Sequence, residues 1–359
     1  MLHRPARTAV SIFGIGIGVL LIIFTIGLAN GSLRDKAQRE GNVGAEIMFR
    51  ASGAKGLSGN DALRMPVSQA DEIAKLEGVG AAIAIAQNTV SASENAFGTR
   101  LVDGVNYDEY AKLAGLKITE GRKFTDGADE IMTDTAWLPQ KKLKIGDTLK
   151  LYDRDFKIVG TFEPAAGARV KIPLKTMQTQ LGSENRASAI LIKAAADITP
   201  ENLGEKLQAK YPDNQIILTK DLPELYMSSI PALGIFLDVV IGVAGVISGL
   251  IISLTMYTTV TERTRQIGVL KSLGMSNKGI ASVIVQEALL LSFGGVLIGI
   301  LLTLIIKYVI QNWTTLKVEI ELYTILTIVF VGLLSGAIGA LYPALRAAQL
   351  DAVEALSYE

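Results

Sequence analysis

Hydrophobic positions gather in four stretches that contain no Asp, Glu, Lys, Arg or His. These stretches cover residues 8–30, 239–261, 288–306 and 322–345. Each approaches or exceeds the roughly 20 residues with which a helix crosses about 30 Å of hydrocarbon. A helix in a soluble core rarely avoids charge for five turns, because one face must meet water. The pattern therefore predicts four transmembrane helices.

The first stretch also invites comparison with a cleaved signal peptide. Its apolar run is longer than the roughly 7–15 residues of a signal core, and Ala29-Asn30-Gly31 is a marginal cleavage site. An uncleaved first helix is therefore the better interpretation. Polar, helix-favouring residues 32–40 follow it, so we expect this helix to continue outward as a stalk.

Residues 31–228 change to the pattern of a soluble α/β domain. Short runs rich in β-branched residues and bounded by Gly, Asn or Asp predict strands. Helices are expected where apolar positions recur at helical spacing, and Ser68 and Thr199 precede two of them as N-caps. The expected strands are 46–50, 82–90, 100–105, 148–152, 156–162, 189–192 and 215–218, and the expected helices are 68–76, 107–113 and 200–209.

The order of these elements suggests two subdomains. Residues 44–106 and 188–220 are expected to form one mixed sheet with helices on one face, and residues 107–187 an insert. Asp153-Arg154-Asp155 is expected to turn a hairpin within that insert. The predicted organisation is first helix and stalk 1–42, outer domain 43–220, stalk and second helix 221–261, a cytoplasmic helix 262–280, third helix 281–307, fourth helix 322–345 and a cytoplasmic tail 346–359.

The distribution of Lys and Arg predicts the orientation. Basic residues flank the apolar stretches on one side at Arg7, Arg263, Lys271 and Arg346, and cytoplasmic loops carry such an excess. The large domain then lies outside the cytoplasm. Arg34, Lys36 and Arg39 oppose this assignment, although large domains translocate largely regardless of charge.

Composition removes several classes of function. Lys plus Arg equals Asp plus Glu at 35 each and aromatics are 6%, which disfavours a nucleic-acid partner. Cysteine is absent and His3 is the one histidine, which excludes thiolate chemistry and His-rich metal sites. The sequence has no G-x-x-x-x-G-K-[ST] phosphate loop. We therefore expect a non-catalytic protein without a cofactor or resident metal.

Glycines recur at four-residue spacing inside the apolar stretches. Such pairs form a flat stripe on which another helix packs closely. The alternative is that Gly is simply frequent in membrane helices. The pairs predicted to pack are Gly14 and Gly18, Gly245 and Gly249, Gly295 and Gly299, and Gly332 and Gly336.

A basic segment joins the second and third apolar stretches. Ile267, Leu270 and Leu273 recur at three-residue spacing, which predicts a short amphipathic helix, and Gly274 follows as a C-cap. The positive-inside rule explains the charges of this segment but not its apolar stripe.

Residues 262–274, ERTRQIGVLKSLG, closely resemble the ERxREIGxLKALG signature of the MacB/FtsX-type permeases, the type VII ABC transporters. The tail 342–356 resembles that family's PAxRAARLDPVEAL ending, with Ala352 where Pro is usual. Segments 121–122, 145–151, 159–160 and 172–174 resemble its periplasmic core domain. The resemblance covers nearly the whole chain.

The resemblance implies a permease subunit of an ATP-driven complex for export or lipoprotein handling in a bacterial inner membrane. A separate cytoplasmic ATPase would dock on Glu262, Arg263, Arg265, Ile267, Leu270, Lys271, Leu273 and Gly274. A second permease copy or homologue, a periplasmic adaptor or effector, and membrane lipid are the other implied partners. Neither the substrate nor the choice between homodimer and heterodimer follows from the sequence.

Two alternatives stay open. An FtsX-like signalling subunit would control a hydrolase outside the cytoplasm, and a sensor would work without an ATPase. Glu287, about two turns into the third helix, is expected to have a structural role, because the apolar stretches offer no second charge as its partner.

Overall fold

The computed structural model describes residues 5–53, 63–93, 96–228, 231–314 and 316–351. The chain divides into two compact units. Residues Met1–Ser32 and Pro231–Glu359 form a helical unit, and residues Leu33–Ile230 form an outer unit.

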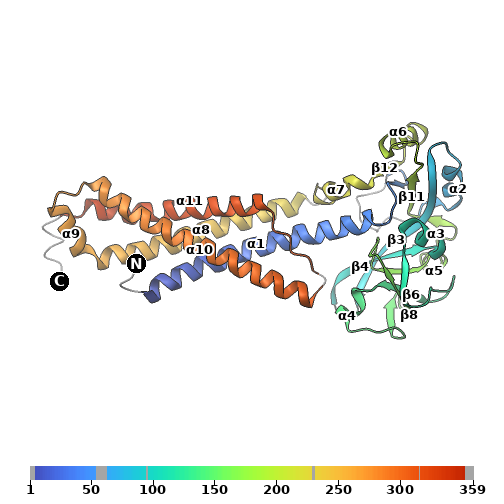
Figure 1. Cartoon of the computed structure of the whole chain (residues 1–359), viewed down its shortest axis with the longest axis horizontal. Helices are drawn as coiled ribbons and strands as arrows, with labels where there is room; N and C mark the ends of the chain where they lie inside the picture. The colour runs from blue at the N-terminus through green and yellow to red at the C-terminus, as the bar shows by residue number, and fades with distance from the viewer. Residues whose placement is uncertain (1–4, 54–62, 94–95, 229–230, 315, 352–359) are drawn as a thin grey trace. The chain divides into compact units, whose positions relative to one another are not determined.

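The helical unit consists of long helices joined by short connections (Figure 1). It contains most of α1 (Pro5–Gly41), then α8 (Pro231–Glu262), α9 (Thr264–Ser272), α10 (Asn277–Trp313) and α11 (Leu322–Gln349). Within the described residues, four helical segments are long and apolar enough to cross a membrane: Thr8–Gly41, Gly234–Glu262, Asn277–Asn312 and Leu322–Gln349. They contain the four predicted stretches, which confirms that expectation. Several extend further because charged residues such as Lys278 and Glu287 continue a helix that a charge-free criterion cuts short.

The outer unit is built on one main sheet (Figure 1). The strand order is β12-β1-β11-β3-β4-β9-β6-β8-β5, with β7 paired to β8, while β2 and β10 pair separately. The strands are β1 (Ile47–Arg50), β2 (Met65–Pro66), β3 (Val79–Ser93), β4 (Ala96–Val105), β5 (Lys117–Gly121), β6 (Glu130–Asp134), β7 (Thr148–Leu151), β8 (Arg154–Glu163), β9 (Val170–Pro173), β10 (Arg186–Ala187), β11 (Ala189–Ala194) and β12 (Gln215–Leu218).

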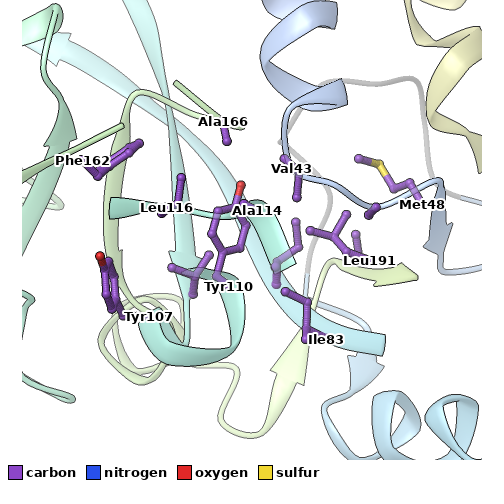
Figure 2. Packing of buried hydrophobic residues seen from close by; sticks show 14 of the residues in the cluster. Val43, Met48, Ile83, Tyr107, Tyr110, Ala114, Leu116, Phe162, Ala166 and Leu191 are labelled. Atoms are coloured by element: carbon purple, nitrogen blue, oxygen red, sulfur yellow. The ribbon is translucent and has the colours of Figure 1, made fainter. Parts of the chain in front are cut away.

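Short helices cover both faces of this sheet. They are α2 (Ser68–Ala74), α3 (Tyr107–Ala114), α4 (Trp137–Lys141), α5 (Leu174–Gln180), α6 (Pro200–Lys210), a 3₁₀ turn (Thr219–Asp221) and α7 (Leu222–Ser228). Along β1, Ile47 and Phe49 pack with α2 and α6, whereas Met48 points to the other face. That second core includes Tyr110 and Val43 (Figure 2). Successive side chains of a strand point to opposite faces of the sheet. Because Ile47, Met48 and Phe49 are all apolar, both faces need a covering layer.

The pairing corrects part of the predicted sheet. The strands of residues 44–106 and 188–220 pair antiparallel throughout, whereas the parallel pairs are β4 with β9 and β6 with β8. The insert therefore extends the same sheet. The expectation of a mixed sheet within residues 44–106 and 188–220 is wrong, whereas the two helices of these residues, α2 and α6, pack on the same face as expected.

Two local predictions in the outer unit are also wrong. Val67, not Ser68, precedes α2, and no side chain caps it. The β7–β8 hairpin turns at Tyr152-Asp153, one residue earlier than expected, with φ of 52° and 61°. Positive φ at both central residues is the backbone of a type I′ turn, whose twist fits a two-residue hairpin. Thr199, by contrast, caps α6 as predicted.

Candidate functional site

The amphipathic segment predicted between the second and third spanning helices forms α9. Arg263 breaks the helix between α8 and α9 with φ −105° and ψ 15°. At the other end Gly274 adopts φ +91°. The Gly274 amide donates to the Lys271 carbonyl (3.0 Å) and the Met275 amide donates to the Leu270 carbonyl (3.1 Å). This pair of bonds is a Schellman motif, which satisfies carbonyls left open at the helix end.

The three apolar residues of the predicted stripe do not share one environment. Ile267 is 8% exposed and belongs to the core of the helical unit. Leu270 is 41% exposed and Leu273 is 79% exposed. Val269 and Met275 are exposed next to them. The exposed apolar face of α9, defined here as Val269, Leu270, Leu273 and Met275, is the part of the segment open to a partner.

Two basic residues of the segment have contacts inside the helical unit. Lys271 Nζ donates to the carbonyls of Ala348 (2.9 Å) and Leu350 (2.5 Å), at the C-terminal end of α11. A cation at that position also offsets the negative end of the helix dipole. Lys271 therefore joins α9 to α11. Glu262 and Arg265 are exposed.

Arg263 reaches α10. Its Nη1 lies 3.4 Å from Oε1 of Glu287, with 35% and 18% of the two side chains exposed. The expectation that Glu287 lacks a charged partner considered the apolar stretches alone, but the partner comes from the turn between α8 and α9. The pair joins that turn to α10, and Gln286 bonds to Ser282 nearby (3.4 Å).

Some predicted glycines lie where two helices approach closely. A Cβ on Gly295 would lie 2.6 Å from Ile15 of α1, and one on Gly299 would lie 2.6 Å from Val19. A Cβ on Gly332 would lie 2.8 Å from Val296, and one on Gly336 would overlap Ser292. These positions pack α1 on α10 and α10 on α11 within one chain.

The other predicted glycines have more room. A Cβ on Gly245 would lie 3.2 Å from Ser335 of α11, and one on Gly249 would lie 3.4 Å from the same residue. On α1, a Cβ on Gly14 would lie 3.7 Å from Ile251, and one on Gly18 would lie 3.9 Å from Ser248. The contacts of the eight predicted glycines thus range from close helix–helix approach to ordinary van der Waals distance.

Sequence reasoning overlooked three tight glycines. Gly16 faces α10, and Gly27 and Gly31 of α1 lie against the extended segment Lys317–Glu319. The Glu319 amide donates to the Gly27 carbonyl (2.9 Å). The four-residue spacing of Gly27 and Gly31 was the signal that could have revealed this contact.

The outer unit contains a hollow of roughly 760 Å³. It lies at the ends of β5, β6 and β8, and its lining residues include Thr119, Asp134, Thr135, Pro164 and Ala165. Among the described residues, no group of three or more His, Cys, Asp or Glu side chains is placed to hold a metal ion.

Comparisons with known proteins agree with this architecture. Residues 8–210 match the MacB-like periplasmic core domain, and residues 239–352 match the FtsX-like permease C-terminal domain. The chain is 25% identical to YknZ of Bacillus subtilis, an uncharacterized ABC transporter permease, over 100% of this chain and 97% of that protein.

A second relative is the macrolide export ATP-binding/permease protein MacB of Mannheimia succiniciproducens. It is 23% identical over 100% of this chain, which spans 60% of the length of that relative. Among solved structures, the periplasmic region of MacB from Actinobacillus actinomycetemcomitans matches with a TM-score of 0.37 and 16% identity, over 50% of this chain and 93% of that one.

Proposed function

Because this chain belongs to the family defined by a MacB-like periplasmic core domain, here joined to an FtsX-like permease C-terminal domain, we propose that it is the permease subunit of an ATP-driven ABC exporter in a bacterial inner membrane. A separate ATPase would supply the energy, and two permease subunits would work together. The role of the permease is to transmit motion to the outer unit for export or lipoprotein handling.

The exposed apolar face of α9 carries this proposal. Leu270 and Leu273 point away from the core, while Ile267 on the same short helix is buried. Lys271 and Arg263 tie the segment to α11 and to Glu287 of α10. A force applied to the exposed face of α9 would therefore reach two spanning helices through these contacts.

The two relatives support a separate ATPase. MacB is named an ATP-binding/permease protein and is much longer than this chain, whereas YknZ, of similar length, is named a permease. Burial of Leu270 and Leu273 in a groove of an ATPase would stabilise the complex by about 1–3 kcal/mol for each side chain. A basic loop that only obeyed the positive-inside rule would not need these residues.

The test is Leu270→Asp. An unpaired charge buried in such a groove costs several kcal/mol, so ATPase co-purification and permease-stimulated ATP hydrolysis should be lost together. Leu270→Met is the matched control, because it keeps an apolar side chain of similar volume at the same position, and it should keep both activities. Wild-type ATPase binding by Leu270→Asp would remove this proposal and favour a sensor that works without an ATPase.

The proposed orientation has its own test. The chain contains no cysteine, so single cysteines at Asn185 and Ser276 give unambiguous labelling sites. We expect Asn185→Cys to react with a membrane-impermeant maleimide that is added to intact spheroplasts. Ser276→Cys should react only after the spheroplasts are lysed. Labelling of Asn185→Cys from the cytoplasmic side would reverse the orientation.

A further inference from the structure

A chain of alternating charges connects the C-terminal end of α1 to the main sheet of the outer unit. Arg39 Nε bonds to Asp35 Oδ2 (3.0 Å) one turn earlier in α1. The same Asp35 oxygen lies 3.2 Å from Arg169 Nη2, and Arg169 Nη1 lies 3.0 Å from Asp134 Oδ2. The four side chains are 17%, 13%, 19% and 2% exposed in the order Arg39, Asp35, Arg169 and Asp134. All four residues belong to the outer unit.

The C-terminal end of α1 also forms hydrogen bonds with the backbone of the loop between β8 and β9. The Gly167 amide donates to the Arg39 carbonyl (2.8 Å), and Arg39 Nη1 donates to the Gly167 carbonyl (3.1 Å). Asn42 Nδ2 donates to the Ala165 carbonyl (2.9 Å). Asp35 and Arg39 lie on one face of α1, because they are four positions apart, and Asn42 directly follows the last residue of the helix. The C-terminal end of α1 thus carries all these attachments.

Buried groups of the sheet hold the same loop from its other side. Lys171 Nζ donates to the carbonyls of Ala166 (2.8 Å) and Ala168 (3.2 Å) and lies 3.1 Å from Asp103 Oδ2. That Asp103 oxygen also accepts from the Ala168 amide (2.7 Å). Lys171 and Asp103 are 0% and 1% exposed. The loop is therefore also held by buried groups of β4 and β9.

Both sets of α1 contacts end at the lining of the hollow. Asp134, at the end of the charge chain, lines it, and so do Pro164 and Ala165 of the loop. Thr119 on β5 is also part of the lining, and its Oγ1 lies 3.0 Å from Oγ1 of Thr135. β5 ends the strand order of the main sheet within the described residues, and its five residues are exposed.

Lys171 and Asp103 hold the loop from the side of the sheet, and Arg39 and Asn42 hold it from the side of α1. The contacts with Asp35, Arg39 and Asn42 connect α1 to the part of the lining formed by Asp134 and Ala165. A rotation or axial shift of α1 displaces Asp35 and Arg39 together, because both belong to one continuous helix, and it pulls on Asn42 directly after the helix end. Ala165 and Asp134 would then move relative to Thr119.

We propose that Arg169 is a positioning residue through which α1 sets the shape of the hollow between β5 and the β8–β9 loop. This inference rests on the proposed function, in which ATP drives motion of the helices. The inference adds the site in the outer unit that the ATP-driven motion of the helices would reach. Arg169 does so by holding one carboxylate of α1 and one carboxylate of the wall at the same time.

The experiment compares two reporter positions in the full chain, assembled with its ATPase in nanodiscs. Thr119→Cys reports on the hollow and Ser32→Cys on α1, since both residues are exposed and the chain has no other cysteine. Maleimide labelling rates are measured without nucleotide and with ATP plus vanadate. Both positions should change rate several-fold on nucleotide binding when residues 35 and 169 are unchanged.

Asp35→Asn and Arg169→Lys then test the charge chain. Asp35→Asn keeps the Arg169–Asp134 pair, and Arg169→Lys keeps the charge but cannot bridge both carboxylates with one planar group. Each should abolish the nucleotide response at Thr119→Cys and preserve it at Ser32→Cys. Arg154→Gln, which removes the Arg154–Asp129 bridge of the same unit, should preserve both responses.

The outcomes separate the inference from the proposed function. A full Thr119→Cys response in Asp35→Asn and Arg169→Lys overturns the role of Arg169 and leaves the exporter proposal intact. Absence of any Ser32→Cys response in the parent protein removes both. Melting followed by tryptophan fluorescence in a Trp313→Phe background, where Trp137 of the outer unit is the one remaining tryptophan, identifies a variant whose outer unit has unfolded. Loss of the response in the other, folded variant then decides.

Discussion

The packing inside the outer unit differs from the packing inside the helical unit. In the outer unit the largest side chains are fully buried, among them Phe49, Tyr110, Phe156 and Phe162. In the helical unit large apolar side chains such as Phe236, Leu254 and Phe330 are more than half exposed. The close contacts there are made at small residues, such as Gly299 and Gly336.

The difference follows from the solvent that each unit meets. Burial of apolar surface away from water stabilises the outer unit. Lipid tails are as apolar as Leu, so burial of Leu between membrane helices gives little free energy and close backbone approach takes its place. The largest side chains therefore point inward in the outer unit, whereas many large side chains of the helical unit point outward. This contrast predicts different responses to substitution.

The largest effect is expected from Lys171→Met in the outer unit. It leaves the Asp103 carboxylate without its charge partner at a fully buried position, although Gln87 Nε2 (3.1 Å) and the Ala168 amide still donate to it. Breaking a buried pair in this way costs about 3–5 kcal/mol. Hydrogen exchange in the sheet, measured on the full chain in detergent, should accelerate by the corresponding factor.

The control for that prediction restores charge balance. Asp103→Asn combined with Lys171→Met removes both charges of the pair and keeps an acceptor for the Ala168 amide, so it should recover much of the protection. If the single variant exchanges as slowly as the parent protein, the Lys171–Asp103 pair has no part in holding the loop.

The next effect is expected from Gly299→Ala in the helical unit. The added Cβ would meet Val19 at 2.6 Å and the Gly16 carbonyl oxygen at 2.7 Å. A backbone atom cannot turn aside as a side chain can, so overpacking should cost about 1–3 kcal/mol. Gly294→Ala, on the same helix, has Ile12 as its nearest neighbour at 3.5 Å and should be tolerated. Equal SDS-unfolding midpoints for the two variants would contradict the packing argument.

The sequence predicts the spanning helices better than the sheet. Bilayer thickness sets both the length and the lack of charge of a spanning helix, so the four stretches needed no tertiary information. β9 escaped prediction because Lys171 interrupts its apolar run, and that charge becomes tolerable only next to Asp103 of β4. β5 escaped because all five of its residues are exposed.

The sequence predicted that the segment of α9 is a helix, but it did not predict which face of this helix is exposed. Ile267, Leu270 and Leu273 repeat every three residues, and each step falls about 60° short of a full turn. Ile267 and Leu273 therefore point about 120° apart, one into the core and one outward. The roles of Lys271 and Arg263 required knowing that α11 and α10 lie beside them.

A smaller effect is expected at the pair that joins the α8–α9 turn to α10. Glu287→Gln removes the charge opposite Arg263, whose side chain is 35% exposed. Solvent screening limits such a pair to about 1 kcal/mol. Amides of α9 should exchange faster, while Arg265→Gln, at an exposed position, should leave them unchanged. Slower exchange in Glu287→Gln would show that the pair strains the turn.

The smallest effect is a pH dependence in the outer unit. Arg122 Nη1 donates to Glu130 Oε2 (2.9 Å), and the Thr125 amide donates to the same oxygen (2.8 Å). The hydrogen bonds from Arg122 are the main cause that holds the pKa of Glu130 below its ordinary value of 4.5. The folded protein thus binds fewer protons at Glu130 than the unfolded chain does near that pH. The stabilising contribution is present above about pH 4.5 and is lost as the pH falls through the lower, folded-state pKa.

Arg122→Gln should therefore lower the melting temperature of the outer unit slightly near pH 7, and this difference should shrink as the pH falls below 4.5. The effect stays within the small range of an exposed ion pair, because the Arg122 side chain is 57% exposed. Lys220→Gln is the matched control, since the Lys220–Glu201 pair is exposed at the other end of the sheet. It should leave the melting difference caused by Arg122→Gln unchanged when the two substitutions are combined. A melting difference for Arg122→Gln that is constant between pH 3 and pH 7 would exclude Glu130 as its source, because loss of the carboxylate charge must abolish any contribution that depends on it.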